Sequence, residues 1–482
     1  MVICVNKSID NNLAQEVDIK AGLENKLNKQ RAAHIANPYP SASEREDRID
    51  RLIDMTLSHQ QKFTEAVNAD FGRRSAINTK MFDLGPVVNA GKHAKKHLRG
   101  WMKTEKRKST FPLGLLGAKS TIEYLPLGVV GNISPWNFPV QLSLQPIVDI
   151  FSAGNRCMLK PSELTPQTSE LMAELVAGNF DESEFSVTTG GPEVAGAFSA
   201  LAYDHLLFTG STNIAKLVAQ SAAPNLVPLT LELGGKNPTV VSPSAKLDEA
   251  AEKVMWAKTM NGGQICLCPD MVYVHESVID EFVESCKQQM KKLYKDFEND
   301  DDFINIISPR HAQRLEDLLQ DAEQKGAELI RFGETKGQCV PPTLVLNTSS
   351  DARLMQEEIF GGPTPIMPYS DCREIANSVN AGEKPLALYY FGSDANEIEY
   401  LSRNVLSGGM TINDCIGHVS QEDLPFGGVG ASGMGVYHGF DGFKNFSHAK
   451  SIYKQSPVDP LKMIRPPYTD KMKKLVESIL KK

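Results

Sequence analysis

The 482-residue sequence lacks a long apolar run, and no stretch approaches the roughly 18 residues that a bilayer span requires. It also lacks a basic excess, since 51 Lys and Arg stand against 59 Asp and Glu, for a net charge of −8. An acidic balance disfavours nucleic acid and anionic membranes as partners. We therefore expect no nucleic-acid partner and no integral membrane span.

Cysteine is sparse as well. The eight cysteines are irregularly spaced, which excludes a disulfide framework. Cys266 and Cys268 have no second Cys or His pair at zinc spacing, so we expect no metal site. Only Met1 to Val5 precede polar residues, which is too short for the core of a signal peptide. A reducing cytoplasm is the predicted location.

What the sequence does contain is a regular alternation of strand-like and helix-like segments from residue 129 onward. Apolar runs lie near 129–133, 156–159, 185–188, 205–208 and 229–233. Helical patterns between them cover 140–153, 165–177 and 212–223. This spacing is typical of a parallel sheet with crossover helices.

A second alternation begins at Pro238. Strands are predicted at 239–241, 271–274, 386–391 and 410–412, with helices at 247–260, 277–293 and 309–324. Near the N-terminus, Ser43 and Glu46 have the spacing of a capping box and predict the start of a helix there. At the C-terminus, the apolar residues from Met472 to Leu480 share one helix face, which we expect to pack on the protein or a second subunit rather than on a membrane.

Four short segments contain residues of the types that catalysis or cofactor binding requires. Cys266, on a loop after a helical pattern, could be a reactive thiolate. Glu232 lies between leucines at a strand end, where burial would raise its pKa and suit it to general-base work. The Asn137 amide, in a proline-stiffened loop, could stabilise an oxyanion. Gly210 and Ser211 enter a helix and could form a phosphate cradle. Taken singly, each segment is better explained by a structural role.

Together and in this order, the segments resemble the aldehyde dehydrogenase superfamily. The resemblance runs from near residue 120 to near 450, and its C-terminal motifs are similar to the class 3 branch, most of all to bacterial coniferyl aldehyde dehydrogenases. The matching stretches are Pro135–Asn137, Lys160–Glu163, Phe208–Ser211, Leu231–Lys236, Gly263–Cys266, Glu357–Gly361, Leu424–Gly428 and Ser432–Gly439.

The resemblance implies a catalytic role for three residues. Cys266 would attack the aldehyde carbon as a thiolate. The Asn137 side chain and the Cys266 backbone N–H would hold the oxyanion. Glu232 would deprotonate the water that hydrolyses the thioester to a free acid.

The cofactor implied is NAD or NADP, bound over the carboxyl ends of the parallel strands. Gly210 and Ser211 would meet the pyrophosphate, while Lys160 would reach the adenosine ribose with Glu163 nearby, and that glutamate favours NAD. On the nicotinamide side, Glu358 would bind the ribose and Phe360 would pack near the ring. Trp256 resembles a residue that lines the substrate tunnel, although plain core packing is an equal alternative.

Four residues depart from the family pattern. Thr259 replaces an aromatic or aliphatic residue, Ala215 replaces a glycine, and Cys268 replaces a small residue. Gly362 interrupts the usual Gly-Pro pair beside the nicotinamide ribose contact, so this change concerns cofactor affinity more than chemistry.

The predicted fold is α/β, with two parallel-sheet, Rossmann-like domains and a β-rich oligomerisation arm. The cofactor domain would comprise 1–117 and 129–233, the catalytic domain 234–415, and the arm 118–128 and 440–482. The arm implies a homodimer. The substrate would be a small-molecule aldehyde, either aromatic, such as coniferaldehyde, or of medium or long chain.

Three alternatives remain at this point. The first is a fatty-aldehyde dehydrogenase. The second is a CoA-acylating or semialdehyde relative, which Glu232 disfavours because that route needs no water-activating base. The third is a non-catalytic protein on this fold, which the joint presence of Cys266, Glu232 and Asn137 disfavours.

Overall fold

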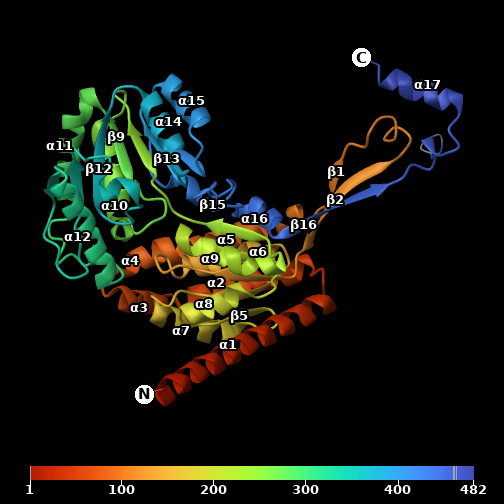
Figure 1. Cartoon of the computed structure of the whole chain (residues 1–482), viewed down its shortest axis with the longest axis horizontal. Coiled ribbons are helices and arrows are strands. Elements are labelled where there is room, and N and C mark those ends of the chain that lie inside the picture. Colours follow the sequence, from red (N-terminus) through yellow and green to blue (C-terminus); the bar gives the residue numbers. More distant parts are fainter. Residues whose placement is uncertain (1, 460–461, 463, 482) are drawn as a thin grey trace.

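The computed structural model describes residues 2–459, 462 and 464–481, with side chains from residue 18 onward. Three sheets organise this part of the chain (Figure 1). A six-stranded and a seven-stranded sheet each lie among helices, and a three-stranded sheet projects away from both. The predicted α/β class with a β-rich arm is therefore confirmed.

The six-stranded sheet has the order β15-β7-β6-β3-β4-β5 and is parallel except at β15. Its strands are β3 (Val129–Ile133), β4 (Arg156–Lys160), β5 (Phe185–Val187), β6 (His205–Thr209), β7 (Leu229–Glu232) and β15 (Gly433–Met434). The first five confirm the predicted strands, and β15 is an addition from far along the chain.

Helices cover both faces of this sheet because neighbouring strand residues point to opposite sides. On one face, Val130 and Leu159 pack with α5 (Gly85–Trp101), α6 (Gln141–Ser152) and α7 (Pro166–Asn179). On the other, Val129 and Met158 pack with α1 (Val2–Ala36), α8 (Pro192–Ser199) and α9 (Thr212–Ala222). Because helices cover both faces, the sheet forms the middle layer of a three-layer domain.

The seven-stranded sheet has the order β10-β11-β12-β9-β8-β13-β14, with only β10 antiparallel to its neighbour. Its strands are β8 (Pro238–Val241), β9 (Met271–His275), β10 (Glu328–Arg331), β11 (Thr343–Leu346), β12 (Pro363–Tyr369), β13 (Ala387–Phe391) and β14 (Gly409–Ile412). The sequence predicted β8, β9, β13 and β14 but missed the other three. β12 contains Pro363, Pro365 and Pro368, which weaken the strand signal.

Helices also cover this second sheet on two sides. Val272 and Val274 pack with α10 (Leu247–Thr259) and α11 (Ile279–Leu293). Met271 and Tyr273 pack instead with α14 (Cys372–Ala381) and α15 (Ala395–Asn404). α12 (Pro309–Gln324) and α13 (Arg353–Gln356) border β10 and β11. α10, α11 and α12 confirm predicted helices.

The arm is an antiparallel sheet of β1 (Glu105–Arg107), β2 (Lys119–Pro126) and β16 (Ser447–Lys454). β1 lies within the range 1–117 assigned to the cofactor domain but pairs with β2, so that boundary was wrong for these residues. α16 (Gly439–Asn445), whose residues 440–445 were assigned to the arm, packs instead on α5 and α6. α17 (Asp470–Ile479) lies beyond the arm sheet (Figure 1).

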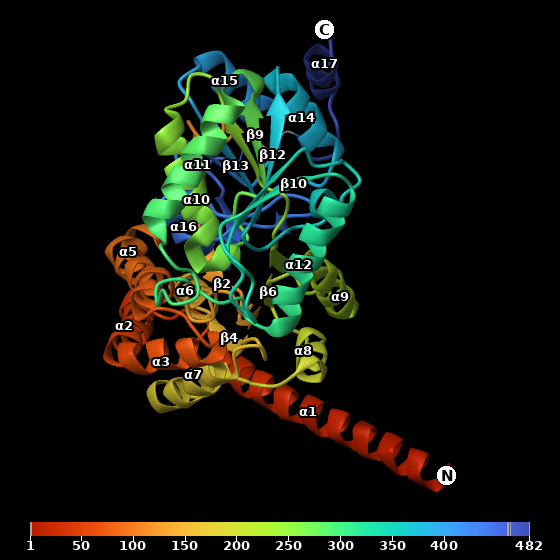
Figure 2. The same ribbon diagram turned by 90° about the vertical axis from the view of Figure 1, so that its left-hand side faces the viewer.

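The N-terminal region is helical, with α1 running diagonally past the main body (Figure 2). Its remaining helices are α2 (Ala42–Ser58), α3 (Gln60–Phe71) and α4 (Ala76–Thr79). The capping box of α2 uses Ser41 and Glu44 rather than the predicted Ser43 and Glu46. Both pairs have the same spacing, and the chain enters the helix two residues earlier. No helix in the described part of the chain combines the length and the apolar character that crossing a bilayer would require.

Candidate active site

Four parallel strands end at one edge of the six-stranded sheet. Ile133 of β3 is in register with Lys160 of β4 and with Phe208 of β6, and Thr209 of β6 is in register with Glu232 of β7. The loops that leave this edge hold the other candidate residues, Asn137, Glu163, Gly210 and Ser211. Pairing between strands distant in sequence therefore brings these predicted residues together.

The turn from β6 into α9 brings the backbone close to β7. The Gly210 N–H donates to the Glu232 carbonyl at 3.0 Å. A Cβ at Gly210 would lie only 2.6 Å from the Phe208 ring, so a side chain has no room there. Ser211 caps α9 and accepts the Ile214 N–H. The helix thus presents its N-terminus at the sheet edge, which is where anionic groups bind.

Lys160 ends β4 and is almost wholly buried, with 2% of its surface exposed. Its ammonium group lies 3.0 Å from the carboxylate of Glu163, which is exposed. The pair presents hydrogen-bonding groups of opposite charge at the same edge of the sheet as the Gly210 turn, with β3 between them.

Glu232 is buried, with 3% exposure, and both of its carboxylate oxygens are without a hydrogen-bond partner among the described residues. Burial raises the pKa of Glu232 well above its ordinary value, because an unpaired carboxylate is poorly solvated there. A carboxyl group in this state is suited to accept a proton near neutral or alkaline pH.

Cys266 lies on the loop that follows α10. Asn261 and Gly262 adopt left-handed backbone conformations, which turn the chain sharply after the helix. The Asn237 amide then donates to the Cys266 carbonyl at 2.7 Å and fixes the loop to the start of β8. Burial, with the carboxyls of Glu358 and Glu232 nearby, raises the pKa of the thiol, so it is protonated at neutral pH until a base removes the proton.

Asn137 is buried in the loop between β3 and α6. Its side-chain amide donates to the Gln264 carbonyl at 3.1 Å, two residues before Cys266. The amide nitrogen is therefore aimed at the cysteine loop. The structure thus brings Cys266, Glu232 and Asn137, predicted from three separate segments, to one region.

Glu358 and Phe360 lie on the loop before β12. The Glu358 carboxylate accepts the Gly235 N–H at 3.2 Å, and burial raises its pKa to about 8, with Asp270 contributing. Phe360 has a left-handed backbone, and its ring lies 5.4 Å from that of Trp136, edge to face.

Side chains that the sequence did not single out hold this loop. Arg314 donates to the carbonyls of Glu358 and Ile359, and Asp270, ion-paired with Lys236, accepts the Ile359 N–H at 2.8 Å. Arg314 lies in an ordinary amphipathic helix, so no local pattern marks it. Lys236 belongs to the motif Leu231–Lys236, but only the three-dimensional structure shows that its partner is Asp270.

Trp256 lies on α10 with 37% of its surface exposed, and its ring is 6.4 Å from that of Phe82. Trp256 is therefore the exposed member of the pair, whereas Phe82 is half-buried and packs against the core.

All four departures from the family pattern are buried. The Thr259 hydroxyl bonds back to the Met255 carbonyl of its own helix, and Ala215 is buried in α9. A Cβ at Gly362 would lie 3.1 Å from Pro342, which explains a small residue there. Cys268 is buried beside Ala257 and is a free thiol.

Comparison with known proteins bears directly on this arrangement. The family model described as "Aldehyde dehydrogenase family" matches residues 18–452. The chain belongs to the aldehyde dehydrogenase family. It is accordingly an aldehyde dehydrogenase, an enzyme that oxidises aldehydes to carboxylic acids.

Relatives of this aldehyde dehydrogenase cover nearly its whole length. It is 45% identical to a probable coniferyl aldehyde dehydrogenase of Caulobacter vibrioides, over 96% of this chain and 98% of that one. It is 43% identical to a coniferyl aldehyde dehydrogenase of a Pseudomonas species, over 94% and 95%. Among solved structures, the substrate-bound state of Staphylococcus aureus AldH aligns with a TM-score of 0.89 at 33% identity, over 95% and 99%.

Proposed function

We propose that this enzyme oxidises an aromatic aldehyde such as coniferaldehyde to the free acid with NAD or NADP, using Cys266 as nucleophile. The convergence of Cys266, Asn137 and the buried, unpartnered carboxylate of Glu232 is the observation that carries the proposal. A CoA-acylating route would not need the carboxylate of Glu232. Burying an unpartnered carboxylate costs free energy, so its presence favours the route that uses it.

The first step forms a bond between the Cys266 sulfur and the aldehyde carbon. Because burial raises its pKa, the partly exposed Cys266 thiol is protonated at rest and loses its proton to solvent as the bond forms. The carbonyl electron pair moves onto oxygen. The Asn137 amide and the Cys266 N–H would hold that oxyanion, each such donor contributing roughly 10²–10³-fold in rate.

A bound nicotinamide would supply the acceptor for the hydride that leaves the carbon attached to sulfur, and Cys266 would then hold the acyl group as a thioester. Glu232 then takes a proton from water, and the hydroxide so formed attacks the thioester carbon. The sulfur leaves as a thiolate and the acid is released. Cysteine suits both steps, since a thiolate is a good nucleophile and a good leaving group.

The residues at the sheet edge fit a dinucleotide. The α9 N-terminus with Gly210 and Ser211 would hold the pyrophosphate, and Lys160 the adenosine ribose. Glu163 beside Lys160 would repel a 2′-phosphate, which favours NAD over NADP. Glu358 would hold the nicotinamide ribose, with Phe360 beside the ring.

The aromatic substrate class is supported by the two coniferyl aldehyde dehydrogenases named above and by the exposed ring of Trp256, which lies near the half-buried ring of Phe82. The test measures NADH formation with coniferaldehyde, benzaldehyde, hexanal and decanal, using Cys266→Ala as control. We expect the native protein to turn over the two aromatic aldehydes and the Cys266→Ala variant to turn over neither. Dominant turnover of decanal would instead assign a fatty-aldehyde enzyme.

We also propose a homodimer joined through the arm, because β16 leaves one long strand edge without a neighbour among the described residues.

The proposed division remains a cofactor domain in 1–117 and 129–233 without β1, a catalytic domain in 234–415, and the arm. A cytoplasmic location is supported by the free thiols of the described cysteines, from Cys157 to Cys415.

A further inference from the structure

A buried ion pair lies next to the loop that contains Asn137, the proposed oxyanion donor. Arg74 and Asp83 are both completely buried, and their side chains contact each other directly. Arg74 lies in the link between α3 and α4, and Asp83 in the single π-helical turn Lys80–Leu84. Neither residue belongs to a stretch that resembles the family motifs.

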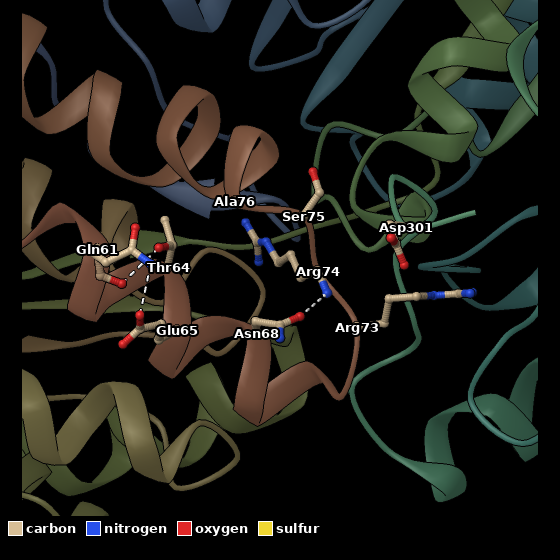
Figure 3. Close-up of a pocket in the computed structure, with 9 residues that line it drawn as sticks. All are labelled: Gln61, Thr64, Glu65, Asn68, Arg73, Arg74, Ser75, Ala76 and Asp301. Atoms are coloured by element: carbon tan, nitrogen blue, oxygen red, sulfur yellow. Dashed lines mark hydrogen bonds between the residues drawn. The ribbon is translucent and has the colours of Figure 1, made fainter. Parts of the chain in front are cut away.

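The link that contains Arg74 borders a cavity of about 350 Å³, so it is not closely packed on that side (Figure 3). Figure 3 shows the side chains of Arg73 and Arg74 leaving the link in different directions. Arg73 bonds to the carbonyls of Phe297 and Glu298. The Arg74 N–H is held by the Asn68 side chain at 2.8 Å, and its guanidinium points into the protein.

The ion pair holds the loop that contains Asn137 at two points. The Arg74 guanidinium donates to the Asn137 carbonyl at 2.8 Å. One Asp83 oxygen accepts the N–H groups of Val140 and Gln141 at 3.0 and 3.1 Å and so caps the start of α6. The loop is therefore held at the Asn137 carbonyl and again where α6 begins.

Asn261 adds a second donor to the same carbonyl. Its side-chain amide donates to Asn137 at 2.8 Å and to the Gln264 carbonyl at 3.1 Å. Gln264 accepts in turn from the Asn137 amide. The Asn137 backbone is thus fixed from two directions, and the bond from its side-chain amide to Gln264 sets the orientation of that amide relative to the cysteine loop.

We propose that Arg74, through its ion pair with Asp83, and Asn261 are positioning residues that hold the Asn137 amide in place for the developing oxyanion. The inference rests on the proposed function, in which Asn137 is that donor. An ion pair suits the task because the planar guanidinium fork fixes direction as well as distance. A buried pair is retained at a desolvation cost, which points to a role beyond packing.

The test compares Arg74→Gln and Asn261→Gly with the native enzyme. Glycine tolerates the left-handed backbone of residue 261, so Asn261→Gly removes the donor and leaves the ion pair intact. We expect kcat to fall roughly 10- to 100-fold in each, part of the loss typical of a missing oxyanion donor, with an unchanged KM for NAD. Arg73→Gln is the matched control, and its kcat should not change.

The decisive measurement repeats both substitutions in an Asn137→Ala background. If Arg74 and Asn261 act through Asn137, they cause no further fall in kcat there, while any loss of thermal stability persists. A further fall of the same size would overturn the inference, as would native kcat in Asn261→Gly. If Asn137→Ala itself retains native kcat, the proposed oxyanion role fails, and the inference fails with it for that separate reason.

Discussion

Burial sets the acid–base state of the three ionisable groups closest to the proposed chemistry. Glu232, Cys266 and Glu358 all have raised pKa values, and removal from water is the main cause in each case. At low pH all three are therefore neutral. Raising the pH supplies the carboxylate that activates water and the carboxylate that would bind the nicotinamide ribose.

The first prediction concerns Glu232. Below its raised pKa the carboxyl is protonated and cannot accept a proton, so kcat should rise with pH. Glu232→Gln should lose this rise and lower kcat by roughly 10²–10⁴-fold, while still releasing one equivalent of NADH in a burst as the thioester forms. Stopped-flow absorbance across pH measures both.

Glu249→Gln, which changes an exposed glutamate on α10, is the control for the first prediction and should behave as native. A Glu232→Gln enzyme that turns over steadily with the native pH profile would show that another base activates water.

The second prediction concerns Trp256. Replacing it with alanine removes the exposed ring of the aromatic pair that Trp256 forms with Phe82. Aromatic contacts of this kind are worth about 0.5–1.5 kcal/mol, so kcat/KM for coniferaldehyde should fall roughly 2- to 10-fold relative to hexanal. Paired steady-state assays give that ratio. An equal fall for both aldehydes would assign Trp256 to packing instead.

At the scale of elements, the site is built from loops that are held in place by side chains outside the proposed chemistry. The β7–β8 turn, the cysteine loop after α10 and the loop before β12 are tied by Asn237, Lys236, Asp270 and Arg314. These ties join loops of the six-stranded and seven-stranded sheets. The candidate site is therefore positioned by contacts between the two halves of the molecule.

The third prediction tests the β7–β8 turn. A Cβ at Gly234 would lie 2.6 Å from the Glu358 carboxyl carbon, so Gly234→Ala should displace that flexible side chain. Because Glu358 would bind the nicotinamide ribose, KM for NAD should rise about 10-fold, corresponding to the roughly 1.5 kcal/mol of one charged hydrogen bond. Initial rates at varied NAD measure it.

Gly178→Ala is the matched control for the third prediction, since a Cβ there has nothing within 4 Å. It makes the same change in α7 and should leave KM unchanged. An unaltered KM in Gly234→Ala as well would remove Glu358 from the cofactor site.

At the scale of the whole molecule, the arm stands apart from the two larger sheets (Figure 1). β16 pairs with β2 along eight residues and leaves its other edge open within the described chain. Beyond it, α17 exposes an apolar face that includes Leu475, Val476 and Ile479. Open edges and exposed apolar faces are features that a second subunit would cover.

The fourth prediction is a dimer of about 106 kDa, twice the 53.0 kDa of one chain. Ala449→Pro removes a backbone donor within β16 and should shift the species toward the monomer mass, because proline interrupts strand pairing. Ala449→Thr keeps the donor and should stay dimeric. Light scattering after size exclusion measures both, and a monomeric native protein would contradict the proposed role of the arm.

Sequence reasoning predicted most of the parallel strands and crossover helices, because buried strands such as β3 and β4 are short apolar runs with turn residues on either side. It failed for β12, whose prolines disguise a strand that tertiary pairing with β9 and β11 enforces. It also divided the chain wrongly at β1, since pairing with β2 across an intervening loop leaves no local signature.

The sequence by itself determined the α/β class, the family and the identity of the candidate residues, because local periodicity and ordered motifs reside in the linear chain. Only the tertiary structure decided that Glu232 is buried without a partner among the described residues, that burial raises the pKa of the Cys266 thiol, and that Arg74 and Asn261 converge on Asn137. Burial and hydrogen-bond direction depend on segments as far as 124 residues apart in sequence, and no local pattern records them.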